Sequence, residues 1–177
     1  MNTLSSFVAF GADHAGYGLK DRLAATLSRP EPRPGFPVLG DSGPRLMARD
    51  FGTNGAESVD YPDYAQRVCQ AVIAGEARFG VLVCGTGIGM SIAANRFPGI
   101  RCALIHDITG ARLTRMHNDA NVIAFGARLI GEEVALDALH VFLTTPYEGG
   151  RHDRRIAKLN AAPALAGEHN MTSFGAT

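Results

Sequence analysis

The sequence lacks several of the features that mark whole classes of protein. Its 17 basic and 17 acidic residues balance, so no net charge draws it to nucleic acid or to an anionic membrane. No window approaches the roughly 18 consecutive apolar residues of a membrane span. The N-terminal segment MNTLSSFVAF contains no basic stretch and no long apolar run, which argues against a secretory leader. We therefore expect a cytoplasmic protein with no nucleic acid or membrane partner.

Cysteine is scarce as well. The three cysteines, Cys69, Cys84 and Cys102, are odd in number and show no CxxC spacing, which fits a reducing compartment better than a disulfide framework. Cys69 lies within an expected helix and Cys102 within an expected strand, so both are interpreted as small buried hydrophobic residues. The histidines form no HxH or HExxH pattern, and we expect neither a metal nor another cofactor.

The length of the chain, 177 residues, suits one domain with a substantial core. We assign residues 1–160 to this domain. Residues 29–50 contain five prolines and three glycines, and they are expected to form a long loop-like insert with a short edge strand near its end. Residues 161–177 form a C-terminal tail that contributes little to a core and either packs on a partner subunit or frays.

Apolar segments of strand length alternate with segments of helical periodicity along the rest of the chain. Near-continuous apolar runs are typical of strands buried on both faces of a parallel sheet. The expected strands cover 7–11, 79–85, 100–107 and 121–128. The expected helices cover 19–29, 61–77, 90–97, 107–119 and 132–145, with Val68, Val72 and Ile73 on one face of the second. This alternation predicts a doubly wound α/β fold.

Polar side chains stand where three of the expected strands end. Asp13 and His14 follow the first strand, Cys84 ends the strand at 79–85, and His106 and Asp107 end the strand at 100–107. Ligands of open α/β sheets bind outside the carboxyl ends of the strands. We therefore expect these groups to converge on one edge of the sheet.

Cys84 is followed at once by Gly85, Gly87 and Gly89, in the segment CGTGIGMS. A glycine-rich turn into a helix directs backbone N–H groups at the thiol, an environment that favours a thiolate and binds anions or an oxyanion. Met90 stands where a dinucleotide-binding fingerprint needs its third glycine, so a nucleotide site is disfavoured. The alternative is a tight strand–helix connection beside a structural thiol.

Arginines gather after the Gly-Gly pair of YEGGRHDRRIAKL, residues 147–159. Arg151, Arg154 and Arg155 fall in the first turns of an expected helix, where the helix dipole disfavours cations. Arg151 and Arg155 are four residues apart and share a helix face. A bound phosphate would offset this clustering; the alternative is a solvated basic face.

His117 and Asn118 end an expected helix in the segment RMHNDAN. Such a pair either binds a ligand or only terminates the helix, and the spacing leaves both interpretations open. With Cys84, the glycine loop and the arginine cluster, the pair supports proton abstraction next to a carbonyl on a small phosphorylated substrate.

Five segments in order, GADHAGYGLK, SVDYPDYA, CGTGIGMSIAANRFPGIRCAL, RMHNDANVIAFGARLIG and PYEGGRHDRRI, resemble the ribose-5-phosphate isomerase B family, which includes galactose-6-phosphate isomerase subunits. The resemblance runs from about residue 7 to about residue 158 and is broken by the insert. It implies a Rossmann-like three-layer α/β/α sandwich with a five-stranded parallel sheet. It also implies a homodimer or a dimer of dimers with shared active sites, and metal-free interconversion of an aldose phosphate and its ketose through an enediolate.

The resemblance also implies roles for individual residues. The catalytic group would be Cys84, His117, Thr86 and Asp13, with Cys84 moving the proton and His117 assisting the opening of the sugar ring. The substrate-binding group would be Asp13, His14, Tyr61, Gly85, Thr86, Gly87, Gly89, Asn118, Arg128, Arg151 and Arg155. One branch of the family carries a glutamate in the glycine loop, and the presence of Cys84 here favours the cysteine-dependent branch.

The expected reaction is the interconversion of ribose 5-phosphate and ribulose 5-phosphate, a step of the non-oxidative pentose phosphate pathway. The alternatives within this class are a tetrose 4-phosphate, allose 6-phosphate or galactose 6-phosphate as substrate. A non-catalytic sugar-phosphate-binding subunit is the alternative from another class. The insert at 29–50 and His106 lie where differences between relatives often alter the choice of substrate.

Overall fold

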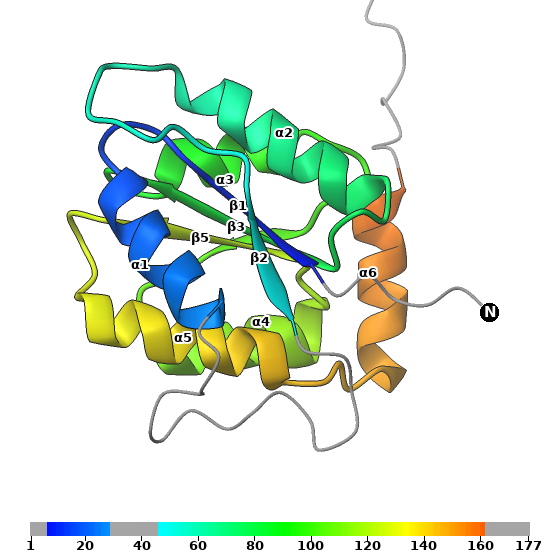
Figure 1. Ribbon diagram of the computed structural model, residues 1–177. Coiled ribbons are helices and arrows are strands. Elements are labelled where there is room, and N and C mark those ends of the chain that lie inside the picture. The colour runs from blue at the N-terminus through cyan, green and yellow to red at the C-terminus, as the bar shows by residue number, and fades with distance from the viewer. Residues whose placement is uncertain (1–6, 29–45, 162–177) are drawn as a thin grey trace, which may run out of the picture.

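The computed structural model describes residues 7–28 and 46–161 of the chain. Its centre is a five-stranded sheet in the order β2-β1-β3-β5-β4, in which every neighbouring pair of strands is parallel (Figure 1). The strands are β1 (Phe7–Ala12), β2 (Met47–Asp50), β3 (Phe79–Cys84), β4 (Cys102–Leu104) and β5 (Val122–Gly126). The predicted α/β fold with five parallel strands is confirmed.

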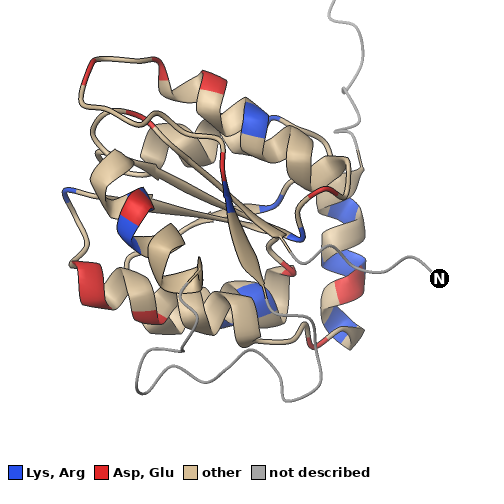
Figure 2. Ribbon diagram, in the orientation of Figure 1, with Lys and Arg blue, Asp and Glu red and all other residues tan. Residues whose placement is uncertain are grey.

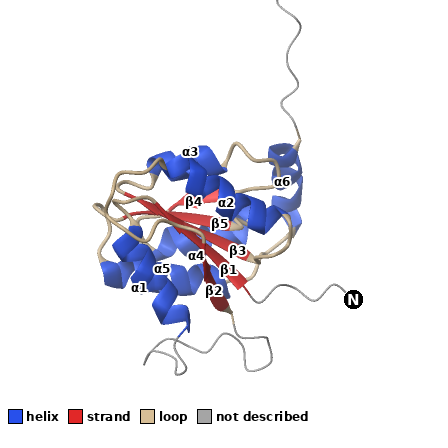
Figure 3. Cartoon of the chain, turned by 45° about the horizontal axis from the view of Figure 1, so that its top comes forward, coloured by secondary structure: helices blue, strands red, loops and turns tan. Residues whose placement is uncertain are grey.

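Helices cover both faces of the sheet (Figure 3). One face packs against α2 (Tyr61–Ile73) and α3 (Ile88–Ala94), and the other against α1 (Tyr17–Ser28), α4 (Ile108–Asn118) and α5 (Glu132–Thr144). A 3-10 turn, η1 (Gly150–His152), leads into α6 (Asp153–Asn160), which stands at the end of the sheet where β1 begins (Figure 1). The result is the three-layer sandwich that the resemblance implies.

Burial on both faces explains the apolar continuity of the strands. Val81 and Val83 of β3 belong to the core beneath α1, α4 and α5, whereas Leu82 and Cys84 belong to the core beneath α2 and α3. Every residue of β3 and β5 is buried. Cys84 therefore sits at the carboxyl end of a central strand, on the face from which α3 departs.

Helix boundaries follow local backbone chemistry. α2 begins with Pro62 in its first turn and ends before Gly75, whose φ of 73° stops the helix earlier than predicted. α3 starts directly after Gly87 (φ 75°), slightly before the predicted start. Asp107 accepts a 2.8 Å hydrogen bond from the Gly110 amide and caps α4, so β4 is shorter than the predicted strand at 100–107.

The apolar face predicted for α2 is only partly buried. Val68 is fully buried and Val72 packs against the core, whereas Ile73 is 52% exposed. Ala65, Cys69 and Ala71 complete the buried stripe.

The insert and the tail are described only in part. Residues 29–45 and 162–177 lie outside the described residues, and nothing tests the roles predicted for them. The end of the insert is β2, which pairs with β1 at the edge of the sheet as predicted. Among the described helices, none is long and apolar enough to cross a bilayer.

A fully buried lysine fastens the segment after β2. Lys20 of α1 pairs with Asp50 at the end of β2, and its ammonium group donates a 3.1 Å hydrogen bond to the carbonyl of Thr53. A buried charge is stable only when it is paired and hydrogen-bonded in this way. Lys20 therefore holds the start of the loop that leads to α2 against the carboxyl ends of β1 and β2.

The loop after β1 lies directly on β3, and this contact yields a test of the fold. A Cβ atom at Gly16 would stand 2.4 Å from the carbonyl oxygen of Val83 and 2.9 Å from the amide nitrogen of Cys84. Both neighbours are backbone atoms of the central strand and cannot move aside cheaply. We expect Gly16→Ala to lower the free energy of unfolding by about 1–3 kcal/mol, as overpacking commonly does, measured by urea denaturation.

Gly55→Ala is the matched control, because a Cβ at Gly55 meets no atom within 4 Å. Its denaturation midpoint should stay close to that of the wild type. Equal stability of the Gly16 and Gly55 variants would contradict the close packing of the loop on β3.

Candidate active site

The thiol of Cys84 is held by the loop that follows it. Its Sγ accepts a 3.1 Å hydrogen bond from the amide of Gly87, and its side chain is almost completely buried, at 5% exposure. This amide stands at the start of α3, where the helix dipole is positive. Backbone N–H groups at a helix start are the surroundings in which cysteines act as thiolates.

The other two cysteines lie in α2 (Cys69) and β4 (Cys102). Burial raises the pKa of Cys69 to about 12. Burial, together with the nearby Cys69, also raises the pKa of Cys102. These thiols stay protonated at neutral pH; Cys69 is buried as predicted, whereas Cys102 is only partly buried.

Two glycines allow the Cys84 loop to press against β5. Gly87 has φ 75°, and a Cβ there would lie 2.8 Å from the carbonyl carbon of Phe125. On β5, a Cβ at Gly126 would lie 2.5 Å from the carbonyl oxygen of Thr86. Both positions exclude any side chain, so the loop backbone is fixed between the ends of β3 and β5.

The two outer glycines of the loop make room for two residues that are predicted to bind the substrate. A Cβ at Gly85 would stand 3.3 Å from the guanidinium group of Arg128, whose own amide bonds to the Gly85 carbonyl at 3.0 Å. A Cβ at Gly89 would stand 2.8 Å from the ring of Tyr61. Arg128 and Tyr61 therefore each lie against a bare Cα of the loop.

Asp13 and His14 stand beside this loop, as the strand ends predicted. Asp13 is buried, and its Oδ1 accepts hydrogen bonds from the amides of Ala15 (2.9 Å) and Gly16 (3.0 Å). His14 accepts a 3.2 Å bond at Nδ1 from the Val59 amide, so in the neutral ring the proton is on Nε2. The contacts of Gly16 with Val83 and Cys84 bring this turn onto the Cys84 backbone.

His106 and Asp107 both follow β4 at the carboxyl edge of the sheet, but their side chains have different surroundings. His106 is exposed, whereas one carboxylate oxygen of Asp107 is engaged as the cap of α4. The cap explains why an aspartate stands there. Of the two residues, only His106 remains a predicted additional contact with the substrate.

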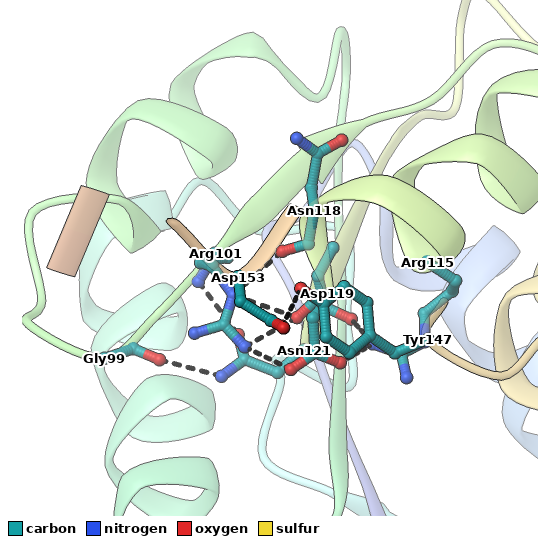
Figure 4. A network of polar contacts seen from close by, with 9 residues as sticks. Gly99, Arg101, Arg115, Asn118, Asp119, Asn121, Tyr147 and Asp153 are labelled. Atoms are coloured by element: carbon teal, nitrogen blue, oxygen red, sulfur yellow. Dashed lines mark hydrogen bonds and ion pairs between the residues drawn. The ribbon is translucent and has the colours of Figure 1, made fainter. Parts of the chain in front are cut away.

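A second group of predicted ligands lies where α4 ends, around a cluster of charged side chains (Figure 4). Asp119 adopts φ 44° and binds the guanidinium groups of Arg101 (2.8 Å) and Arg115 (2.7 Å). Arg115 is buried, with its guanidinium over the rings of Phe79 and Phe142. This anchored turn fixes the position of His117 and Asn118, two and one residues earlier.

Asn118 contributes its backbone to the cluster and leaves its side chain outside it. Its carbonyl accepts a 3.0 Å bond from Arg101 Nε, while its amide group points away from the network (Figure 4). Asn121, the last residue of the RMHNDAN segment, donates to the Gly99 carbonyl and accepts from the Arg101 amide. Of the two asparagines, Asn118 is the one whose amide group stays outside the network, and it borders an open groove of about 720 Å³.

The predicted arginine cluster adjoins the same turn. Arg151 lies in η1 and Arg155 in α6, both exposed, and basic positions recur along the α6 ribbon (Figure 2). Tyr147 donates a 2.7 Å bond to Asp153. Burial and this bond raise the pKa of Tyr147 to about 12, so the phenol stays a donor and ties the segment before η1 to α6.

The structure adds two residues that the sequence did not single out. The ring of His152 stacks on that of His117, and the carboxylate of Glu148 faces both. Burial, His117, Arg151 and Arg155 lower the pKa of His152. Sequence offered one signal for this contact, the Gly-Gly pair before Arg151, but it was interpreted only as a break before a helix.

The residues around Cys84 and the residues around His117 lie at opposite edges of the sheet within one chain. Cys84 pairs with Gly126 at the carboxyl end of the sheet, whereas Asn121 bonds to Gly80 at the amino end. The length of β5 between these ends is roughly 13 Å, at about 3.3 Å per residue. α4 starts at the carboxyl edge and runs back, so it delivers His117 to the amino edge. Within one chain the predicted residues thus form two half-sites.

Comparison with known proteins agrees with this geometry. The Ribose/Galactose Isomerase family matches residues 8–159. The ribose-5-phosphate isomerase B of Escherichia coli (strain K12) is 43% identical over 154 residues, which cover 87% of this chain and 94% of the relative.

Solved structures give the same result. A ribose 5-phosphate isomerase of Thermotoga maritima superposes with a TM-score of 0.76 at 46% identity, covering 87% of this chain and 97% of that one. Ribose-5-phosphate isomerase B of Clostridium thermocellum gives 0.77 at 42% identity, covering 87% and 95%. Because the family match and these relatives cover nearly all of the described residues, the chain belongs to the ribose/galactose isomerase family.

Proposed function

We propose that this protein interconverts ribose 5-phosphate and ribulose 5-phosphate in the cytoplasm. The observation that carries the proposal is the hydrogen bond from the Gly87 amide to Cys84 Sγ, at the start of α3. It gives the edge of the sheet a thiol suited to act as a base. The relatives named ribose-5-phosphate isomerase B support the choice of sugar.

The isomerisation moves one proton between neighbouring carbons. In the proposal Cys84 takes the proton from C2 of the open-chain aldose and returns it to C1, while a hydroxyl proton passes between O2 and O1. The negative charge that develops on oxygen is stabilised by backbone N–H groups of residues 85–89, fixed between β3 and β5. Asp13 and Thr86, on the same edge, are assigned to the sugar hydroxyls.

The second half-site is assigned to the cyclic form and the phosphate. His117 would assist ring opening, Asn118 would bind sugar oxygens, and Arg151 and Arg155 would hold the phosphate by charge-assisted hydrogen bonds. Arg128 completes the phosphate or sugar contacts from the Cys84 side. The guanidinium of Arg128 lies against Gly85 in the structure, which supports this assignment.

Two copies of the chain are needed to join the half-sites. The helices that flank edge strand β4 expose four large aliphatic side chains, Ile88 and Ile92 of α3 and Ile108 and Leu113 of α4. A two-fold axis perpendicular to the strands at this face would reverse the strand direction in the partner, so that the carboxyl edge of one copy would meet the amino edge of the other. We therefore propose a homodimer, alone or paired into a tetramer, with active sites shared between subunits.

The first test measures turnover of ribose 5-phosphate, allose 6-phosphate, galactose 6-phosphate and erythrose 4-phosphate by the wild type and by Cys84→Ala. We expect the highest kcat/KM on ribose 5-phosphate, and a kcat lower by about 10²–10⁴-fold in the variant, the usual contribution of a general base. Phosphate binding should persist because the arginines are intact.

Cys102→Ala is the matched control and should retain near wild-type turnover, since its thiol is away from the glycine loop. Full activity of Cys84→Ala would remove the proposed base. Preference for another sugar would keep the chemistry and reassign the substrate. No turnover of any of the four sugars would favour a binding subunit.

The second test asks whether the half-sites act in trans. Cys84→Ala and His117→Ala should each be nearly inactive as homodimers. In a heterodimer of the two, one site contains both substitutions and the other contains neither. Heterodimers purified with two different affinity tags should recover about half of the wild-type turnover per dimer, because one of the two shared sites is intact.

The control heterodimer joins Cys84→Ala with Thr86→Ala, both in the same half-site. Each of its sites then carries one substitution, so turnover per dimer should equal the mean of the Cys84→Ala and Thr86→Ala homodimers, with no recovery above it. If the heterodimer of Cys84→Ala and His117→Ala shows no recovery, the sites are not shared in the way proposed.

A further inference from the structure

His117 and His152 form a stacked pair at the second half-site. Their ring centroids are 4.5 Å apart and their planes differ by 10°. His152 is 4% exposed, whereas the side chain of His117 is one-third exposed. The buried ring is therefore a platform on which the accessible ring lies.

Glu148 completes the arrangement. One of its carboxylate oxygens lies 3.8 Å from Nε2 of His117 and 3.6 Å from Nε2 of His152. Its own amide donates a 3.1 Å bond to the Met116 carbonyl at the end of α4. The segment that carries Glu148 is thus fastened to the helix that carries His117.

Two glycines turn the chain so that His152 returns beneath His117. Gly149 adopts φ 68° and ψ −148°, a conformation essentially restricted to glycine, and Gly150 has φ 61°. The His152 amide then bonds to the Gly149 carbonyl at 3.2 Å. The Gly-Gly pair therefore forms this turn, in addition to preceding the helix.

Two imidazoles and a carboxylate within 4.8 Å of one another could suggest a metal site. The geometry argues against it, because nearly parallel stacked rings send their lone pairs along parallel lines rather than toward one ion. The charge argues against it as well, because the Nε–H of Arg151 points at His152 Nε2. The cluster is better understood as a support for neighbouring groups.

The hydrogen bond with Arg151 defines what His152 does. Arg151 Nε donates to His152 Nε2 at 3.3 Å, which requires that nitrogen to be unprotonated. Burial and the neighbouring His117, Arg151 and Arg155 lower the pKa of His152, while Glu148 opposes them. The buried ring is thus neutral at physiological pH and orients the guanidinium of Arg151.

We infer that His152 is a positioning residue for the proposed reaction, acting on two groups at once. Its ring face fixes the imidazole of His117, which opens the sugar ring, and its Nε2 fixes the guanidinium of Arg151, which binds the phosphate. Glu148 locks the assembly to α4. This inference rests on the proposed function for the roles of His117 and Arg151, but the contacts themselves can be tested without it.

The test separates the ring face from the acceptor nitrogen with two substitutions. His152→Phe keeps an aromatic platform and loses the acceptor, whereas His152→Gln keeps an acceptor near the place of Nε2 and loses the platform. His140→Gln on α5 is the control for loss of a histidine elsewhere. Thermal unfolding and subunit size by gel filtration establish that each variant is folded.

Two readouts do not depend on catalysis. The first is the ring-current shift of the His117 C–H proton signals in NMR spectra, which should persist in His152→Phe and vanish in His152→Gln. The second is the affinity for inorganic phosphate by calorimetry. The dissociation constant should rise about tenfold in His152→Phe and stay within about twofold of the wild type in His152→Gln, since one hydrogen bond to a charged group is lost only in the former.

Kinetics on ribose 5-phosphate should show the same division. We expect His152→Phe mainly to raise KM, and His152→Gln mainly to lower kcat by about tenfold or more, because a loosely held catalytic ring loses its reactive geometry. Ribulose 5-phosphate cannot close a five-membered ring, since its O5 carries the phosphate. Exchange of its C1 proton with deuterated water therefore needs Cys84 but no ring opening, and it should be unchanged in His152→Gln.

The outcomes separate the inference from the proposed function. If the wild type does not isomerise ribose 5-phosphate, the proposed function fails, yet the NMR and phosphate readouts still decide whether His152 positions its two neighbours. If both variants change the same readouts equally, or neither changes them, His152 is only a core residue and the inference is overturned. A loss of C1 exchange in His152→Gln matching its loss of kcat would also overturn it, because the damage would then reach the Cys84 half-site.

Discussion

The close approach of the Cys84 loop to the end of β5 is the constraint on which the rest of the site depends. At Gly87 and Gly126 a Cβ atom would meet backbone atoms at 2.8 and 2.5 Å, so the loop can take only the path that directs the Gly87 amide at Cys84 Sγ. The same path brings the bare Cα atoms of the outer glycines against Arg128 and Tyr61. The hydrogen bond to the thiol persists because the surrounding backbone cannot relax away from it, and the role proposed for Cys84 depends on this contact.

The direction of α4 imposes the second constraint. In a parallel sheet a helix that follows one strand must run back to the start of the next, so residues at its end stand far from residues at the strand ends. His117 and Asn118 are therefore separated from Cys84 within the chain, however well their turn is anchored by Asp119 and its arginines. The proposed reaction uses both groups and would therefore need a second chain, for which the exposed aliphatic side chains beside β4 offer a surface.

Sequence alone predicted much of this arrangement. Apolar continuity located the strands because both faces of the sheet are covered, and the strand ends located Asp13 and Cys84 because parallel strands share one carboxyl edge. Helix limits and the exposure of Ile73 were missed, since a positive φ at a glycine and the exact footprint of a helix on the sheet are set by tertiary contacts. The roles of individual site residues came from family resemblance and stay predictions.

His152 and Glu148 were not predicted from the sequence, for a physical reason. His152 and Glu148 lie far along the chain from His117, and only the turn at Gly149 and Gly150 brings them beneath its ring. Neither has the spacing of a catalytic motif, because a supporting residue needs only to face its neighbour in space. In this fold the ring of His117 and the guanidinium of Arg151 share one buried neighbour, His152. The orientation of one is therefore coupled to the orientation of the other. In the proposed function this coupling would suit a substrate that is held at its phosphate while its far end changes shape.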